Sequence, residues 1–392
     1  MPLRIPPRLR WTCQIVAVCC AFSPPATLLA QPTAKVVLGR WARHLEVGPE
    51  MDARGVKLYG SEFVDQDLRN ARFDHCVLYG VKFEACRLNN ASFRGAILAG
   101  AFLDGTNYCN ADFTDAVISN MRSRPSFTPE QLMSTHSYKT GNLENVLISG
   151  RALEATNEPP QYDFRRANLS GARFSAGDFT KSDFAGAILS GVSFGGSLVS
   201  FESLSRSATF RSRQLQGMTF GLVRFVDACD FSGMDLTGAR FSNLRKWGAE
   251  TYELPIKLDR AIIRDARFSE SPPGTYNFIN KEHIYSTASY RQGDLRGVTF
   301  SGLDLSGIDF SKQNLTGAAF IQCDLSNADF TDAVITGANF GQHGRQIPFA
   351  RPNPGLTIEQ IRSTWNFKQG RMDGIQLPPD LSAALAEEAE NR

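Results

Sequence analysis

The stretch that decides the fold is residues 294–340, which read DLRGVTFSGLDLSGIDFSKQNLTGAAFIQCDLSNADFTDAVITGANF. An apolar side chain recurs there at every fifth position without a slip, from Leu295 and Phe300 to Phe340. This period matches neither an α-helix, which repeats every ~3.6 residues, nor a β-strand, which alternates every two. It predicts a chain that turns a corner every five residues, with the apolar side chain of each repeat, its centre, pointing inward.

The same period covers most of the chain. It runs from Leu58 to Ile118, from Phe164 to Phe194 and, with one slip, from Leu215 to Phe268. Four faces of five residues would close a coil of about 20 residues, and neighbouring coils would pair their backbones about 4.8 Å apart. Centres one coil apart would then stack in columns, such as Phe73, Phe93 and Phe113. Such columns account for most of the 28 Phe in the chain, against 9 Tyr and 4 Trp.

The two residues before many centres carry a further signature. A small residue and then Asp or Asn come first in Ala111-Asp112-Phe113, Ala167-Asn168-Leu169, Ala328-Asp329-Phe330 and Ala338-Asn339-Phe340. In this pattern the chain resembles the pentapeptide-repeat proteins over most of residues 56–377. The resemblance implies an all-β solenoid, a right-handed quadrilateral β-helix of pentapeptide repeats, and it implies no chemistry. The repeats form four blocks, at about residues 56–120, 138–200, 210–268 and 290–340.

Four similar segments interrupt the repeats, near residues 128–136, 201–207, 280–287 and 357–364. Thr128 and Gln131 fit a helix capping box, as do Thr357 and Gln360. We therefore expect a helix of one or two turns in each interruption. Two interpretations are open: the helices are covers or stops between blocks of coil, or they form a recognition ridge along one side of the rod.

The two ends of the chain have their own patterns. In residues 1–30, three arginines precede an apolar run that ends at Phe22, and Ala30 offers a small residue at a cleavage site. This is typical of a secretory signal peptide, so we expect export to the periplasm or the medium after cleavage near Ala30. Residues 31–55 would cap the first coil, and residues 378–392 would form a tail with a short acidic helix, because open ends of a β-helix expose unpaired strand edges.

Composition bears on the class of partner. The formal net charge is +2, so nothing in the composition favours a basic nucleic-acid binder. No apolar run reaches the ~18 residues that a membrane-spanning helix requires. We therefore expect a protein partner, with no nucleic acid and no membrane span.

The cysteines and histidines match no catalytic or metal-binding motif. Cys76, Cys86, Cys229 and Cys323 stand two residues before a centre, where Ala is common, and Cys109 is the exception. Because CxxC-type spacing is missing, we expect buried packing thiols rather than metal ligands or disulfides. The histidines are scattered, at His44, His75, His136, His283 and His343. The sequence thus predicts no catalytic residue, no metal ligand and no cofactor.

Acidic residues before the centres of the last block are the strongest candidates for a charged functional surface. Asp304 should stack over Asp324, and Asp309 over Asp329, with Asp294 on the preceding coil. Some members of the family that the chain resembles mimic DNA with such a surface and bind type II topoisomerases. Against DNA mimicry, the first block places Lys and Arg at several of the same positions, which interrupts an acidic face.

The sequence therefore favours a non-catalytic exported repeat scaffold or protein-binding surface. A DNA-mimicking, topoisomerase-binding pentapeptide protein is one alternative. An exported carbohydrate-active β-helix enzyme is another, but such enzymes resemble larger three-sided coils with catalytic loops, and this chain shows neither.

Overall fold

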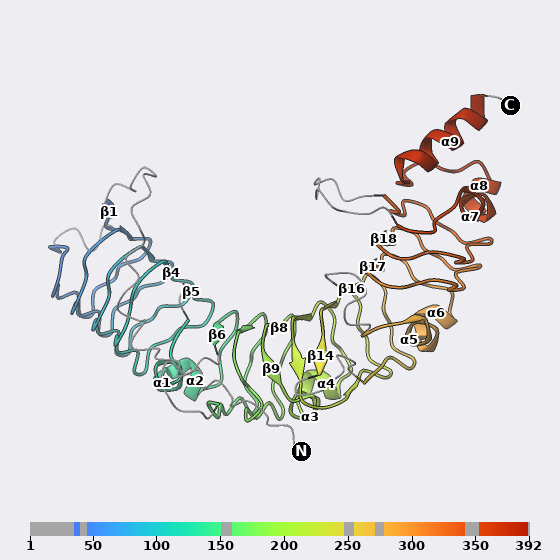
Figure 1. Ribbon diagram of the computed structural model, residues 1–392. Helices are drawn as coiled ribbons and strands as arrows, with labels where there is room; N and C mark the ends of the chain where they lie inside the picture. The colour runs from blue at the N-terminus through green and yellow to red at the C-terminus, as the bar shows by residue number, and fades with distance from the viewer. Residues whose placement is uncertain are drawn as a thin grey trace, which may run out of the picture.

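The computed structural model describes residues 35–39, 45–124, 126–149, 159–246, 255–270, 278–341 and 353–390. The predicted signal peptide lies outside these residues. The described chain winds into a long coil that curves as an arc (Figure 1). Short parallel strands and isolated bridges join each coil to the next.

Backbone pairing follows the five-residue period. Asp52 pairs with Arg72 and Lys57 with Val77, each 20 residues further along, and all these pairs are parallel. Rows through Glu62 and Asp67 continue the series, so four rows of pairing are offset by five residues. The period that the sequence predicts for side-chain burial is therefore also the period of the backbone hydrogen bonds.

The first sheet begins at an antiparallel edge. β1 (Lys35–Val37) pairs antiparallel with β2 (Glu62–Val64) and covers the edge that β2 would otherwise expose. The remaining strands of this sheet follow in parallel: β3 (Lys82–Glu84), β4 (Phe102–Asp104) and β5 (Arg122–Arg124).

The second sheet has eight strands and lies along the concave side of the arc (Figure 1). Its strands are β6 (Leu147–Ser149), β7 (Arg173–Ser175), β8 (Ser193–Gly195), β10 (Thr219–Gly221), β13 (Arg240–Ser242), β16 (Arg267–Ser269), β17 (Thr299–Ser301) and β18 (Ala319–Ile321). Neighbours in this series pair in parallel without a break. The coil is therefore continuous from β6 to β18.

Two smaller sheets occupy other rows of the central coils. One contains β9 (Leu198–Val199), β11 (Arg224–Phe225) and β14 (Arg245–Lys246). The other pairs β12 (Cys229–Asp230) with β15 (Ile256–Lys257).

The core is built from columns of centre residues. The rings of Phe73, Phe93 and Phe113 stack with centroids 5.0 Å apart and planes within 8° of parallel. Leu58 and Leu78, in a different row, are fully buried. The predicted aromatic columns are confirmed, and their spacing lies in the range where aromatic rings attract one another.

The corner after each centre also has a fixed geometry. The residue two positions after a centre adopts a left-handed conformation, for example Asn70 (φ 59°) and Gly80 (φ 65°). Gly has no Cβ to clash in this region, and Asn tolerates it better than most residues. This explains why Gly and Asn recur at that position.

The described residues contain four pairs of short helices, which lie along the convex side of the arc (Figure 1). They are α1 (Pro129–Ser134) with α2 (His136–Lys139), α3 (Phe201–Ser205) with α4 (Ala208–Arg211), α5 (Lys281–Ser286) with α6 (Ala288–Arg291), and α7 (Ile358–Ser363) with α8 (Trp365–Lys368). A further helix, α9 (Pro379–Glu390), follows the last coil. In the described part of the chain, no helix is long and apolar enough to cross a membrane.

Each interruption thus holds two helices, where the sequence analysis expects one. The reason is visible at Thr135, which is extended (φ −68°, ψ 152°) and ends α1. Its side chain accepts a hydrogen bond from the Tyr138 N–H and so caps a second helix at once. The sequence does not reveal a residue that caps two helices, because the pattern Thr-x-Ser-aromatic at Thr135 carries no helical period.

The centre columns lead to a stability prediction. Phe310 is fully buried, so Phe310→Ala should lower the free energy of unfolding by roughly 3–5 kcal/mol, the usual cost of emptying an aromatic site. Asn314→Ala, one residue before a centre, removes one hydrogen bond to the Thr316 N–H and should cost about 1 kcal/mol. Denaturant melts of the two variants would measure the difference, and equal midpoint shifts would contradict the assigned register.

Candidate interaction surface

The predicted acidic columns exist, but their carboxylates are used by the fold. Asp304 pairs with Asp324 on the next coil, and Asp309 with Asp329. In each case an oxygen of the carboxylate accepts the backbone N–H two residues later, at 2.7–3.0 Å. The acids therefore satisfy backbone donors at the corners.

Residues 313–317 show why such a side chain is needed. Four of their five N–H groups donate to backbone carbonyls. The fifth, on Thr316, donates to the side-chain oxygen of Asn314 at 3.1 Å. A half-buried N–H without a partner would be costly, so Asp or Asn before the centre stabilises the turn.

The electrostatics of these acids agree with a structural role. Hydrogen bonds from Thr331 lower the pKa of Asp329, and those from Ser306 lower the pKa of Asp304. The Arg165 guanidinium, which binds both carboxylate oxygens, lowers the pKa of Asp163 to about 2. Asp304, Asp309 and Asp329 are exposed, but each also has a structural role in its turn, and Asp163 has one in an ion pair.

The thiols are packing groups. Cys76, Cys86, Cys229 and Cys323 are buried, as the sequence predicts, whereas Cys109 is half-buried. Burial raises the pKa of Cys76 and Cys86 to about 11 and that of Cys323 to about 12. Among the residues that the structure describes, no group of His, Cys, Asp and Glu side chains is arranged to hold a metal ion.

The helix pairs share one face of the coil. The apolar residue of each first helix, such as Leu132 or Ile361, is buried above a centre of the preceding coil. The Asp115 N–H donates to the Ser134 carbonyl, and the Asp332 N–H donates to the Ser363 carbonyl, both at 3.0 Å. Residues 186 and 260 make the equivalent bonds to α3–α4 and α5–α6. All four pairs therefore replace the same face of their coils.

A side chain near the start of each first helix anchors it to the coil below. In α1, Gln131 donates to the carbonyls of Ala111 and Tyr108, and its oxygen accepts the Thr128 N–H. Gln360 repeats this arrangement in α7. In α5, Nδ1 of His283 accepts the Asn280 N–H, so Nε2 carries the proton that it donates to the Ile256 carbonyl.

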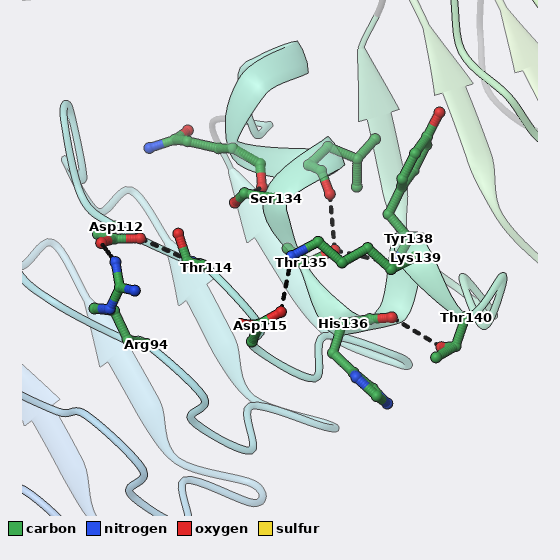
Figure 2. A network of polar contacts seen from close by, with 12 residues as sticks. Arg94, Asp112, Thr114, Asp115, Ser134, Thr135, His136, Tyr138, Lys139 and Thr140 are labelled. Atoms are coloured by element: carbon green, nitrogen blue, oxygen red, sulfur yellow. Dashed lines mark hydrogen bonds and ion pairs between the residues drawn. The ribbon is translucent and has the colours of Figure 1, made fainter.

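The junction between the two helices is a second anchor (Figure 2). The Thr135 hydroxyl donates to the Leu132 carbonyl at 2.7 Å and accepts the Tyr138 N–H at 3.1 Å. Two residues later, the Ser137 hydroxyl accepts the N–H of the buried centre Ile118 at 2.9 Å. Equivalent side chains accept the centre N–H in the other pairs, namely Thr209, Ser289 and Asn366.

The helix pairs recur at a constant interval. Between one pair and the next, the backbone passes through two regular coils, as the pairings Asn142–Asn168–Ile188 and Gln214–Asp235–Ile262 show. The interval is therefore three coils, or about 14 Å at the spacing of paired strands. We call these four pairs, α1–α2, α3–α4, α5–α6 and α7–α8, the helix ridge.

The helix ridge carries a repeated pattern of exposed charge. Each first helix has an acid in its first turn, and each second helix ends in a base. The acids are Glu130, Glu202, Glu282 and Glu359, and the bases are Lys139, Arg211, Arg291 and Lys368. The sequence offers a ridge as one of two interpretations but does not place these charges, because the second helices carry no helical period.

A family model described as pentapeptide repeats (8 copies) matches residues 86–120, 163–198, 293–332 and 314–342. The chain contains pentapeptide repeats over these residues. The matched residues lie within the predicted repeat blocks, apart from a few residues at their edges. No curated protein sequence matches the chain.

Two solved pentapeptide-repeat structures are similar to the chain at low identity. HetL, involved in heterocyst differentiation regulation in the cyanobacterium Nostoc sp. Strain PCC 7120, is 19% identical over 78% of this chain and 90% of that chain, with a TM-score of 0.15. QnrB1, a plasmid-mediated fluoroquinolone resistance protein, is 15% identical over 80% of this chain and 96% of that chain, with a TM-score of 0.12. At these values neither likeness carries a functional argument.

The junction between the two helices can be tested by removing one hydroxyl. Thr135→Val keeps the shape of the fully buried side chain but leaves the half-buried Tyr138 N–H without its acceptor. We expect a loss of about 1–3 kcal/mol in the free energy of unfolding. Thr140→Val, which removes an exposed hydroxyl, is the matched control and should change it by less than about 0.5 kcal/mol. Similar losses in hydrogen-exchange protection of α2 for both variants would contradict the assigned role.

The acids that precede the centres, Asp304 and Asp329, predict how stability depends on pH. Their pKa is lower in the folded protein than in the unfolded chain, so their stabilisation is present above about pH 4 and is lost as the pH falls through the folded pKa. The denaturant midpoint should therefore drop on acidification. In the Asp304→Asn, Asp329→Asn double variant the amide oxygens still accept the N–H groups, as Asn314 does, and the drop should be smaller. The same pH profile in both proteins would show that these carboxylates are not the source.

Proposed function

We propose that the protein is an exported, non-catalytic scaffold, a right-handed four-sided β-helix whose helix ridge binds a protein partner. The four offset rows of parallel pairing support the four-sided coil. The proposed role of the ridge depends on one observation, which concerns the opposite face.

That observation is the continuity of the eight-stranded sheet. Its strands pair without interruption from β6 to β18, past both α3–α4 and α5–α6. A helix pair that stopped the coil would break this sheet, so the interpretation of α3–α4 and α5–α6 as stops between blocks loses its support. At α1–α2 the five-stranded sheet ends at β5 and the eight-stranded sheet begins at β6, but the Asn120 N–H donates to the Glu144 carbonyl, so the coil resumes after this pair too. The equal intervals between the pairs favour a role in recognition.

The charges of the last block disfavour DNA mimicry. Asp304, Asp309, Asp324 and Asp329 each accept a backbone N–H, and Asp294 is paired with Arg296 at 2.7 Å. These acids have a structural reason to be present, so a DNA-like partner is not needed to explain them. A protein partner on the convex side is the simpler proposal.

Export is tested by the N-terminus of the protein in its native host. We expect the mature chain to begin at or near Gln31, because the basic and apolar pattern of residues 1–30 is that of a signal peptide. Edman sequencing or terminal-peptide mass spectrometry of the fractionated protein would establish this. An intact Met1 on protein recovered from the cytoplasm would contradict export.

Partner binding is tested by photo-crosslinking in intact cells. A photoreactive amino acid at the exposed ridge positions Ser212 or Gln292 should capture one and the same protein. The matched controls are Arg173 and Arg240, which are exposed on the concave sheet and should not capture it. Equal capture from both faces, or from neither, would contradict a ridge-specific partner.

A further inference from the structure

The helix ridge contains two kinds of pair, which differ in one position of the coil beneath. In the first pair, Lys139 binds the Asp115 carboxylate at 2.8 Å (Figure 2). In the last pair, Lys368 binds the Asp332 carboxylate at 2.7 Å. Asp115 and Asp332 occupy the same left-handed corner, two residues after a buried Phe centre (φ 59° and 57°). The base of each outer pair is therefore neutralised by the chain itself.

The two middle pairs lack this carboxylate. The equivalent corner is Gly186 (φ 71°) beneath Arg211 and Arg260 (φ 58°) beneath Arg291. The equivalence is fixed by hydrogen bonds: the Gly186 N–H donates to the Arg206 carbonyl and the Arg260 N–H to the Ser286 carbonyl, as at Asp115. One middle pair thus has no acid below its arginine, and the other has a second arginine there.

A depression of about 970 Å³ lies beside α3–α4, and residues 230–234 and Arg260 of the neighbouring coils complete its lining. Arg211, Arg213 and Arg260 line it, together with the apolar side chains of Phe201 and Met234. Gly233 in its lining leaves room for Arg213, because a Cβ there would lie 3.1 Å from a guanidinium nitrogen. We call this depression the cationic groove.

The acids near the cationic groove do not neutralise it. Asp230 lines the groove, but its carboxylate accepts the Ser232 N–H and faces Lys257 on the paired strand. Glu202, on α3, is paired with Arg206. Within the described residues, the ion pairs of the chain leave Arg211, Arg213 and Arg260 without a carboxylate partner. The groove therefore carries an excess of positive charge.

We propose that the cationic groove binds a short, extended, carboxylate-rich segment of the protein partner. This rests on the proposed function, because it names the binding site on the scaffold and the chemistry of its partner. Guanidinium groups bind carboxylates in a two-pronged geometry, and the apolar side chains of the groove exclude water beside them. Arg291, on α6, lies outside the lining of the groove and stands three coils, or about 14 Å, from Arg211, so acidic residues about four positions apart on an extended chain would reach both arginines.

The four copies of the ridge supply the variants that test this. Gly186→Asp gives Arg211 the carboxylate that Lys139 already has, and Gly186→Asn is the uncharged control of equal size. A Cβ at Gly186 would meet its nearest atom, on Arg166, at 3.4 Å, and Asp and Asn are the side chains that best tolerate the left-handed φ of 71° at this corner. Arg260→Asp, with Arg260→Asn as control, converts the second middle pair to the outer pattern at a corner that suits Asp.

The probe is a fluorescein-labelled extended peptide with aspartates about four residues apart, and its binding to the full-length protein is followed by anisotropy at low salt. We expect Gly186→Asp and Arg260→Asp each to weaken binding about fivefold relative to the Asn controls, and added salt to weaken it further. Lys139→Ala should have little effect, because that charge is already paired. Circular dichroism melts verify that each variant is folded.

Three results would overturn the inference. They are equal affinity for a peptide with Asn in place of Asp, equal or tighter binding of a single-stranded DNA of the same charge, and an unchanged affinity in both Asp variants. The scaffold proposal is judged separately: a partner captured at Ser212 without any binding of the acidic peptide would refute the groove and leave the ridge. Peptide binding without capture of a partner at the ridge would support the groove and refute the ridge as the site of partner binding.

Discussion

The structure depends on one constraint, that the centre of each repeat must stack on the centre one coil earlier. The Phe columns satisfy it directly, with rings about one coil rise apart. The backbone then turns after every centre, so a left-handed corner such as Asn70 follows. The turn leaves one N–H without a backbone acceptor, which explains the Asp or Asn before the centre. The recurrence of Phe at the centres, of Asn and Gly at the corners, and of Asp or Asn before the centres follows from this single requirement.

The helix pairs interrupt the five-residue repeat but preserve the stacking of the core and the register of the coil. An apolar residue such as Leu132 fills the place of a centre, so the column beneath remains covered. The side chains of Gln131 and Ser137 make the bonds to the coil below that a strand would have made with its backbone. The coil therefore resumes in register after each pair, and the concave sheet runs unbroken past α3–α4 and α5–α6, whereas at α1–α2 one sheet ends at β5 and the next begins at β6. The inserted helices therefore project from the surface of the coil while its core stays covered.

Sequence alone predicts those features that repeat with the period of burial. The centres, the Phe columns, the stacked Asp304 and Asp324, and the buried thiol of Cys323 all follow from position within the repeat. The second helices do not, since they depend on an extended Thr135 that caps in two directions. The regular recurrence of the pairs is visible in the sequence, where Leu132, Leu204, Ile284 and Ile361 stand 72, 80 and 77 residues apart. The number of coils in each interval is not, because inserted segments between blocks obscure it. The missing carboxylate at Gly186 is recognised only by comparison with the equivalent positions Asp115 and Asp332 beneath the outer helix pairs.

The central claim is that the helix pairs stand on one face at intervals of three coils, and distances between spin labels test it most directly. The C-cap residues Thr140, Gln292 and Gln369, with Ser212, are exposed and equivalent. With Cys109 and the three cysteines of residues 1–30 replaced by Ser, cysteines introduced there label selectively, because the four remaining thiols are buried. Electron double resonance should give equal distances for the pairs 140–292 and 212–369, roughly 30 Å each, and a distance about half as long again for 140–369. Unequal distances for the first two pairs, or a third that is no longer than they are, would contradict the account.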